Sequence, residues 1–251
     1  MNTPSATFYC WFGKRFVDSV VSFVGLVALS PLFLLVAIAV RVSSPGPALF
    51  SQIRTGRFQR PFRILKFRTM QLAPPRPGSL LTAAGDSRIT PLGRWLRKTK
   101  IDELPQLLNV LVGQMSLVGP RPEVPLYTEK YSPRQKRVLL IRPGITSPKI
   151  NFDEEEMLAR GEDKERLYLE VVLPAKLERE LLYCQSVGFC EDQRVVLQTV
   201  AGVARRILGS LGVSHQCSEQ IGVEREKSAA VTLAAPAQGK TSCDQHSSSR
   251  L

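Results

Sequence analysis

The apolar positions of this chain are concentrated in one run near its N-terminus. Residues 19–40 contain no charged side chain, and a helix of that length could span the hydrocarbon core of a bilayer, which is about 30 Å thick. Ser30-Pro31 lies near the middle of the run. Because proline cannot donate to the carbonyl of Val27, we expect a helix–break–helix here, in which the Ser30 hydroxyl satisfies freed backbone groups.

Basic residues at both ends of this run bear on its topology. Lys14 and Arg15 precede it, and it is followed by Arg41, Arg54, Arg57, Arg60 and Arg63. Positive charge is retained on the cytoplasmic side of membranes, so both ends are drawn to one side and a re-entrant hairpin satisfies them. A kinked single-span anchor and a buried core helix are the alternatives. Asp18 is expected to stay near the headgroups or to pair with a cation such as Arg15.

The pattern after the run predicts a small sheet. Alternation over residues 48–54 and 61–69 indicates two strands joined by a loop. In the second strand the period of two puts Lys66 and Arg68 on one face and Phe67 on the apolar face.

Helical periodicity dominates the rest of the chain. An apolar stripe at Leu104, Leu107, Leu108 and Leu111 predicts a helix with Asp102 as its N-cap. A basic helix is predicted before it, starting near residue 93, and another over 123–137. Residues 153–209 predict acidic amphipathic helices interrupted at Gly161, Pro174 and Gly188, and the last helix, which carries Arg205 and Arg206, could lie against a bilayer.

Together these elements predict an α+β, mainly helical fold. Residues 1–45 form an interfacial N-terminus and a re-entrant membrane hairpin. Residues 46–210 form a cytoplasmic domain with a small β-hairpin and amphipathic interfacial helices. Residues 211–251 contain no aromatic residue and are predicted to be a disordered tail.

Charge narrows the choice of partner. Residues 41–150 hold 20 Lys and Arg against 5 Asp and Glu, so this segment faces nucleic acid, lipid headgroups or a diphosphate. It contains no recognisable nucleic-acid-binding motif. A membrane-anchored nucleic-acid-binding protein and a non-catalytic membrane scaffold remain the alternative functions. Five scattered cysteines without a Cys-x-x-Cys support neither a zinc site nor a disulfide framework.

The adjacent carboxylates Asp102 and Glu103 are the candidate catalytic residues. At a helix start, free amides and the helix dipole keep Asp102 ionised and also attract phosphate. Such a carboxylate can attack phosphorus, while Glu103 beside it can hold Mg²⁺ together with diphosphate oxygens. The candidate phosphate-binding cations are Lys66, Arg68, Arg97 and Arg121. Taken singly, Asp-x-x-Pro is more often a cap and Gly-Pro-Arg-Pro a turn.

The chain resembles the bacterial sugar transferases of the monotopic phosphoglycosyl transferase family. The resemblance covers about residues 14–210 and rests on an ordered set of segments: Lys14-Arg15 with Asp18, Ser30-Pro31, Ser44-Pro45-Gly46-Pro47, Phe50-x-Gln52-x-Arg54-x-Gly56, Lys66-Phe67-Arg68-Thr69-Met70, Arg88-x-Thr90-x-x-Gly93, Leu96-Arg97, Asp102-Glu103-Leu104-Pro105-Gln106-Leu107, Asn109-Val110-Leu111, Met115 to Pro122, and Arg142-Pro143-Gly144-Ile145-Thr146. It departs at Ser147-Pro148-Lys149, where many members have Gly-Leu-x-Gln-Val, which leaves the sugar open.

This resemblance implies an undecaprenyl-phosphate sugar phosphotransferase of the phosphoglycosyl transferase class. Asp102 would attack the β-phosphorus of a UDP-sugar and release UMP, and polyprenyl phosphate would then take the sugar phosphate. Glu103 and Asp102 would act with Mg²⁺ as cofactor, and Arg142 joins the phosphate-binding set. The implied partners are UDP-sugar, polyprenyl phosphate and the lipid bilayer, not nucleic acid, with a homodimer and downstream glycosyltransferases as candidates. The implied place is the cytoplasmic face of the bacterial inner membrane, at the first membrane step of surface polysaccharide assembly.

Overall fold

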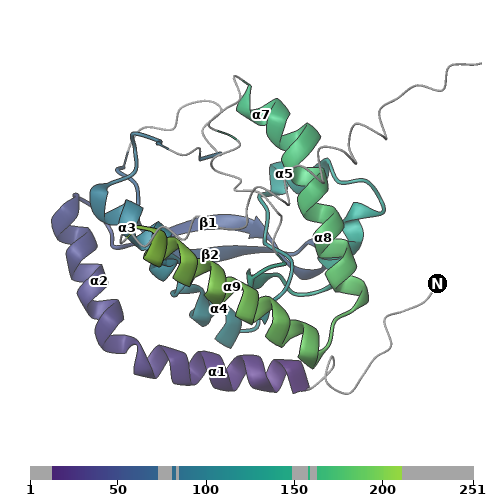
Figure 1. The fold of residues 1–251 in the computed structure, drawn as a ribbon, viewed down its shortest axis with the longest axis horizontal. Coiled ribbons are helices and arrows are strands. Elements are labelled where there is room, and N and C mark those ends of the chain that lie inside the picture. Colours follow the sequence, from purple (N-terminus) through teal and green to yellow (C-terminus); the bar gives the residue numbers. More distant parts are fainter. Residues whose placement is uncertain (1–12, 73–80, 83–84, 149–157, 159–162, 211–251) are drawn as a thin grey trace, which may run out of the picture. The chain divides into compact units, whose positions relative to one another are not determined.

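The computed structural model describes residues 13–72, 81–82, 85–148, 158 and 163–210 (Figure 1). These residues belong to one compact unit, Met1–Leu211. The fold is mainly helical with two small sheets, which agrees with the predicted α+β class. The predicted disordered tail and the predicted interruption at Gly161 lie outside the described residues.

The described elements are short apart from α1, α2, α8 and α9. The helices are α1 (Lys14–Ala28), α2 (Ser30–Ser43), α3 (Pro91–Thr99), α4 (Gln106–Leu111), α5 (Pro125–Glu129), α7 (Lys164–Leu167), α8 (Leu173–Gln185) and α9 (Phe189–Ser210). The strands are β1 (Leu49–Thr55), β2 (Pro61–Phe67), β3 (Ser116–Val118) and β4 (Gly144–Thr146). Tighter turns are η2 (Arg57–Gln59), η3 (Ile101–Glu103) and η4 (Gln135–Leu140), and η5 (Tyr168–Val172) is a π turn.

The predicted helix break is confirmed at Leu29. Helices α1 and α2 are bent by 62° at this point, and Pro31 lies in the first turn of α2. The Ser30 hydroxyl donates to the carbonyl oxygen of Val27 (2.8 Å), the acceptor to which Pro31 cannot donate because it lacks an amide hydrogen. Of the described helices, none alone has the length and hydropathy to cross a bilayer, whereas the bent pair has both when taken together.

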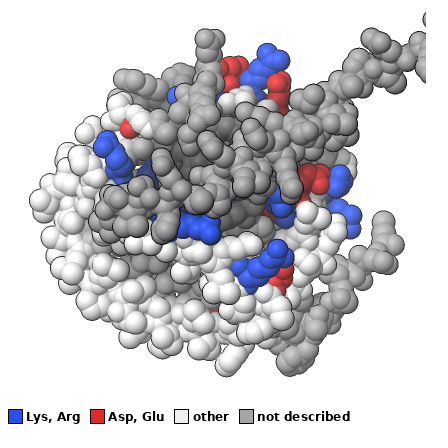
Figure 2. Space-filling model, in the orientation of Figure 1, with Lys and Arg blue, Asp and Glu red and all other residues white. Residues whose placement is uncertain are grey.

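One face of the bent pair is apolar and exposed. Along α1 and α2, at the bottom and left of the view, the surface carries almost no charged side chain (Figure 2). The exposed apolar residues there are Phe16, Val20, Val21, Phe23, Val24, Val27, Leu34, Leu35, Ile38 and Val42. The core of a globular protein would cover such residues, so this face requires an apolar environment from elsewhere.

The other face of α1 is anchored to the domain by polar contacts. Asp18 is buried (4% exposed), and its carboxylate accepts from the backbone amide of Leu117 (3.1 Å). Arg15 donates to the carbonyl oxygens of Val110 (2.5 Å) and Leu111 (2.8 Å) at the end of α4. Asp18 therefore does not pair with Arg15 as expected, because each side chain satisfies the backbone of a different packed element; its position near the headgroups stays a prediction.

The β1–β2 hairpin matches the predicted strands to within two residues. The strands pair antiparallel from Leu49↔Phe67 to Thr55↔Pro61. The side chain of Asn109 closes the other edge of β2, since it accepts from the amide of Leu65 (3.1 Å) and donates to the carbonyl of Arg63 (2.8 Å). Helix α4 is thereby fixed to the strand that carries Lys66.

The predicted cationic face of β2 is only half right. Phe67 is buried among residues of α2 and α3, as expected. However, Phe62 and Ile64, on the same face as Lys66, are buried against Val110 and Met115. Arg68 is also buried (5% exposed), and its guanidinium donates to carbonyl oxygens of the Ser44–Gly46 turn. The pattern fails because helices cover both faces of this two-stranded sheet.

Two of the predicted helices have different limits in the structure. The helix predicted over 123–137 is interrupted: α5 ends at Glu129, and η4 starts only at Gln135. Pro133 explains the interruption, since it lacks an amide and disfavours helical dihedrals at the residue before it. Pro174, by contrast, does not interrupt its helix, because it lies in the first turn of α8 directly after the π turn η5.

We expect Gly93→Ala to destabilise the fold strongly. A Cβ at this position would lie 2.0 Å from the carbonyl oxygen of Thr69, which is backbone and cannot rotate away. Overpacking of this kind costs about 1 to 3 kcal/mol, or more. Gly188→Ala is the matched control, because its Cβ would lie 3.7 Å from its nearest neighbour. Thermal unfolding in detergent should show a lower Tm for the first variant only; equal Tm values would contradict this packing.

Candidate active site

Asp102 and Glu103 lie in a tight turn between two helices. Helix α3 ends at Thr99, Lys100 adopts a left-handed conformation (φ 60°), and η3 carries both carboxylates. Helix α4 begins only at Gln106. The prediction that Asp102 caps this helix was wrong: the amide of Leu104 bonds to the carbonyl of Ile101 (3.2 Å), and this turn separates Asp102 from the free amides of α4.

Glu103 is held by two cations from different parts of the chain. Its Oε1 accepts from Nζ of Lys66 on β2 (2.8 Å) and from the guanidinium of Arg121 (3.0 Å). Burial alone would raise the pKa of Glu103, but Arg121 and Lys66 hold it well below its usual value. Burial in turn lowers the pKa of Lys66, which Glu103 opposes. Glu103 is therefore a permanently ionised anchor for both cations.

Asp102 has the opposite environment. It is 7% exposed, and its Oδ1 is buried with no hydrogen-bond partner among the described residues. Burial and the charge of Glu103 raise the pKa of Asp102 to about 6, against nearby cations: Lys66, Lys100 and Arg97. The adjacent carboxylates are thus driven apart in pKa, which is characteristic of acid, base or nucleophile pairs in catalytic sites.

A polar cleft lies next to this pair. It is lined by Arg54, Ile64, Lys66, Gln106, Arg121, Pro122 and Gly144. Three of these residues are cations, and arginine binds phosphate oxygens in a bidentate manner. The cleft measures about 10 Å³, and its three cations suit the oxygen atoms of an anion of high charge density, such as a phosphate group.

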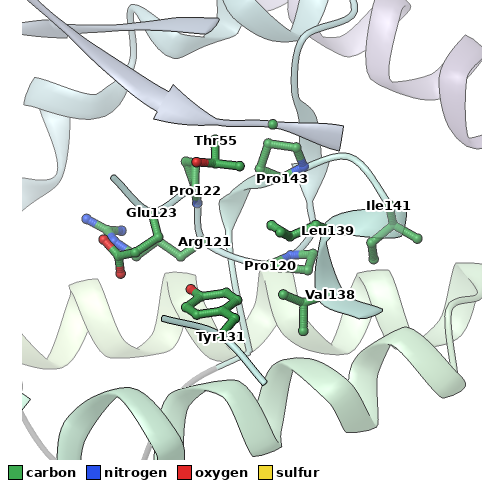
Figure 3. Close-up of a pocket in the computed structure, with 11 residues that line it drawn as sticks. Thr55, Pro120, Arg121, Pro122, Glu123, Tyr131, Val138, Leu139, Ile141 and Pro143 are labelled. Atoms are coloured by element: carbon green, nitrogen blue, oxygen red, sulfur yellow. The ribbon is translucent and has the colours of Figure 1, made fainter. Parts of the chain in front are cut away.

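The loop that carries Arg121 has a closely packed underside. Pro120 and Pro122 flank Arg121, and together with Thr55, Tyr131 and Pro143 they line a cavity (Figure 3). This cavity measures about 10 Å³, enough for about one water molecule and far too small for a nucleotide. It supports the loop rather than binding a substrate.

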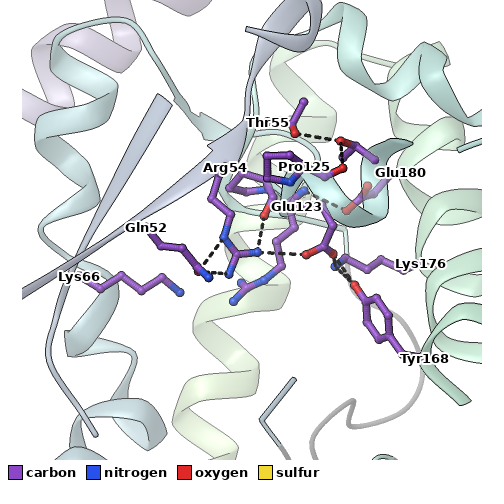
Figure 4. A network of polar contacts seen from close by, with 12 residues as sticks. Gln52, Arg54, Thr55, Lys66, Glu123, Pro125, Tyr168, Lys176 and Glu180 are labelled. Atoms are coloured by element: carbon purple, nitrogen blue, oxygen red, sulfur yellow. Dashed lines mark hydrogen bonds and ion pairs between the residues drawn. The ribbon is translucent and has the colours of Figure 1, made fainter. Parts of the chain in front are cut away.

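A buried ionic network fixes the same loop from the other side (Figure 4). Glu123 accepts from Arg54 of β1 (3.0 Å), from Lys176 of α8 (2.8 Å) and from the hydroxyl of Tyr168. Burial opposes ionisation, but Lys176 and Arg54 lower the pKa of Glu123 to about 2.

Glu180 of α8 accepts from the backbone amide of Arg121 (2.9 Å), and burial raises the pKa of Glu180 to about 7. Arg121 is thus held at its backbone by α8 and at its guanidinium by Glu103.

The structure brings some predicted site residues together and separates others. Lys66 and Arg121 contact Glu103, and the charge of Arg97 acts on Asp102. The guanidinium of Arg68 is used by the Ser44–Gly46 turn instead. Arg142 donates to the carbonyl of Gly113 (3.0 Å), and the charges that act on it are those of Arg57, Arg15 and Asp18. The phosphate-binding role expected for these two arginines therefore stays a prediction, and the hydrogen bonds described for their side chains go to backbone carbonyl oxygens.

The sequence reasoning missed the residues on α8. Lys176 and Glu180 are both buried and belong to the same face as Leu173, Leu177 and Leu181. Two charged residues at helical spacing within an apolar stripe are a detectable signal, because charged groups are buried only when they are paired. Arg54 gave no such signal, since strand residues with charged side chains are usually solvated.

The carboxylate pair also has the donor type for a hard divalent cation. No group of three or more His, Cys, Asp or Glu side chains that could hold a metal occurs in the described part of the chain. Mg²⁺, however, is commonly bound through one or two carboxylates together with substrate phosphates. The unpartnered Oδ1 of Asp102, next to Glu103 and the cationic cleft, fits that mode.

Comparison with known proteins identifies the family. The bacterial sugar transferase family model matches residues 9–206. The chain is 39% identical over 190 residues to the UDP-glucose:undecaprenyl-phosphate glucose-1-phosphate transferase of Caulobacter vibrioides (74% of this chain, 68% of that protein). It is 41% identical over 204 residues to the UDP-N-acetylgalactosamine-undecaprenyl-phosphate N-acetylgalactosaminephosphotransferase of Aeromonas hydrophila (80% and 45%).

A third relative is the UDP-glucose:undecaprenyl-phosphate glucose-1-phosphate transferase of Klebsiella pneumoniae, 36% identical over 191 residues (74% of this chain, 39% of that protein). The matches therefore span about two thirds of the Caulobacter protein and less than half of the other two. Each match covers about three quarters or more of this chain. The chain belongs to the bacterial sugar transferase family.

Proposed function

We propose that this protein transfers a sugar 1-phosphate from a UDP-sugar to polyprenyl phosphate, through a covalent intermediate on Asp102. One observation carries the proposal: Asp102 presents a buried, unpartnered carboxylate oxygen next to Glu103, whose partners Lys66 and Arg121 line a polar cleft. The named activities of the relatives are undecaprenyl-phosphate sugar-1-phosphate transfers. Those names include both glucose and N-acetylgalactosamine, so they do not select the hexose.

The first step is an attack of the Asp102 carboxylate on the β-phosphorus of the donor. A bond forms between Asp102 and that phosphorus, and the bond from the phosphorus to the bridging oxygen breaks, which releases UMP with the electron pair. Arg121 and Lys66, fixed by Glu103 at 3.0 and 2.8 Å, are positioned to balance the charge of the diphosphate. Preorganised cations of this kind stabilise transition states without rearranging.

The second step regenerates the carboxylate. An oxygen of polyprenyl phosphate attacks the same phosphorus, and the acyl-phosphate bond to Asp102 breaks, which gives polyprenyl-diphosphate-sugar. No proton transfer is needed at Asp102 in either step. A carboxylate that is desolvated yet ionised near neutral pH suits both roles, since it is reactive as a nucleophile and acceptable as a leaving group.

Asp102 and Glu103 are also the residues that would hold Mg²⁺. The ion would supply further neutralisation of the diphosphate charge. Within the protein, Oε1 of Glu103 already bonds to Lys66 and Arg121, so the unpartnered Oδ1 of Asp102 is the better placed donor.

We further propose that α1 and α2 form a re-entrant hairpin in the bacterial inner membrane, with the active site on the cytoplasmic side. The 62° bend, the exposed apolar face and the basic residues at both ends support this placement. Polyprenyl phosphate carries its reactive group at the headgroup level, where a hairpin anchored to α4 would hold the dyad.

We expect Asp102→Asn to lower turnover by at least about 10⁴-fold, the scale of nucleophile removal in other enzymes. Its Tm should not fall. The raised pKa means that the charged form costs roughly 2 to 3 kcal/mol of folding free energy, and this cost develops as the pH rises from about 4 through 6. UMP release and thermal unfolding in detergent measure the two effects.

Asp163→Asn is the matched control for this variant. It makes the same chemical change at the exposed N-cap of α7, where asparagine caps equally well. Wild-type turnover in Asp102→Asn would remove Asp102 as the nucleophile, and a loss of activity in Asp163→Asn would show that the assay reports general damage.

The rate of loading of the enzyme should follow the ionisation of Asp102. With a pKa of about 6, the rate of adduct formation should fall about tenfold per pH unit below 6 and level off above 7. Intact-mass spectrometry after rapid quenching measures the sugar-phosphate adduct. Glu103→Gln removes the neighbouring negative charge, which should lower the pKa of Asp102 and shift the fall in the rate of adduct formation to lower pH. Product formation without any adduct would establish direct displacement instead.

The hairpin predicts that both of its ends react from one side of the membrane. In a variant lacking the five native cysteines, Asn2→Cys and Ser51→Cys should both be labelled by an impermeant maleimide only in inverted vesicles. A spanning helix would expose the two positions on opposite sides, and that result would eliminate the re-entrant topology.

A further inference from the structure

Three arginines from distant segments lie close together: Arg15 in the first turn of α1, Arg57 in the β1–β2 turn, and Arg142 just before β4. The guanidinium of Arg15 lies close to Gly113: a Cβ added at this glycine would be 3.2 Å from it. Arg142 donates to the carbonyl oxygen of the same Gly113 (3.0 Å). Arg57 of η2 donates to the carbonyl of Leu140, two residues before Arg142 (3.0 Å). We call these three residues the hairpin-end arginine cluster.

The cluster lacks neutralising partners. Among the described residues, none of its members forms an ion pair, and their hydrogen bonds go to backbone carbonyl oxygens. Within the described part of the chain, the acidic charge that acts on Arg142 is that of Asp18, whose carboxylate accepts from the Leu117 amide. Burial, Arg57 and Arg15 lower the pKa of Arg142. By contrast, Arg54, Lys66 and Arg121 are all paired with glutamates. The cluster is therefore a concentration of positive charge that an anion would stabilise.

Exposed apolar residues lie near the cluster in the sequence. Phe16 (71% exposed) follows Arg15, Phe58 (56%) follows Arg57, Val112 (60%) precedes Gly113, and Leu140 (54%) lies two residues before Arg142. Phe58 has a positive φ of 57°, which is costly for a bulky residue, and Arg57 lies over its ring at 4.5 Å. Apolar residues beside unpaired arginines are typical of surfaces that enter the headgroup region of a bilayer.

We propose that the hairpin-end arginine cluster binds the phosphate of an anionic membrane lipid. Guanidinium groups match phosphate oxygens in geometry and charge, and the exposed apolar residues near the cluster in sequence favour a lipid over a soluble phosphate. The site is distinct from the active site, because neither Asp102 nor Glu103 is among the charges that act on Arg142. It rests on the proposed membrane placement and not on the transfer reaction. Its function is to fix the depth of α1, and with it α4, at the interface.

Lipid binding by Arg57→Gln tests the proposal. Arg57 is exposed and makes one backbone hydrogen bond, so the variant should fold. Purified full-length protein in non-ionic detergent is titrated with phosphatidylglycerol or phosphatidylcholine, and retained lipid is counted by native mass spectrometry. We expect wild type to prefer phosphatidylglycerol and Arg57→Gln to bind it about fivefold more weakly, the factor for ~1 kcal/mol per cation at an anionic surface. Arg57→Gln/Arg142→Gln should bind more weakly still.

The matched control is Arg134→Gln, which removes one positive charge from an arginine paired with Glu178 on the surface. Its affinity for phosphatidylglycerol should equal that of wild type. If Arg134→Gln lost as much affinity for phosphatidylglycerol as Arg57→Gln, the binding would depend on the overall positive charge of the protein, and the proposed site would be overturned. Saturation of the cluster by inorganic phosphate, or by an oligonucleotide at the same concentration, would overturn the assignment to lipid.

The measurement is repeated in Asp102→Asn protein. Lipid preference that persists there supports the cluster independently of the transfer reaction. If wild-type protein turns over its substrates but shows no preference for phosphatidylglycerol, the lipid site is disproved and the proposed transfer reaction is unaffected. If the double variant unfolds, the single variant Arg57→Gln and its charge-preserving counterpart Arg57→Lys decide the outcome, since the lysine should retain most of the affinity.

Discussion

The structure depends on keeping two adjacent carboxylates ionised in a site that water hardly reaches. Burying a charge is costly unless it is paired, and Asp102 and Glu103 are each 7% exposed. Glu103 meets this constraint through Lys66 and Arg121, whereas Asp102 keeps an oxygen without a partner. Lys66 acts on both groups: it pairs with Glu103, and its charge opposes the rise that burial and Glu103 cause in the pKa of Asp102.

The surrounding network explains how those cations keep their positions. Arg121 lies on a loop between two prolines, and α8 holds that loop through Glu180 at the Arg121 amide and through Lys176 at Glu123. Each buried acid in this region is satisfied by donors from other elements, so removing one partner would leave an unpaired charge in the interior. Through Lys176 and Glu180, α8 therefore fixes the loop that carries Arg121.

Helices α1 and α2 and the carboxylate pair are connected through α4. Arg15 and Asp18 bind backbone groups at and beyond the end of α4, while Asn109 fixes the same helix to the edge of β2. The helix that follows the dyad and the strand that carries Lys66 are therefore held together, and α1 is anchored to both of them through α4.

The sequence by itself determined the features that depend on local chemistry: the break at Ser30-Pro31, the β1–β2 hairpin, the start of the basic helix and the family-specific dyad. Proline geometry and side-chain periodicity act within a few residues and are legible in the chain. Only the tertiary structure decided that Asp102 does not cap α4, that Arg68 and Arg142 bind backbone carbonyl oxygens, and that Lys176 and Glu180 are buried and hold the loop of Arg121. Their partners are distant in sequence, 53 residues apart for Lys176 and Glu123, and the burial that makes such charges matter exists only once the helices have packed.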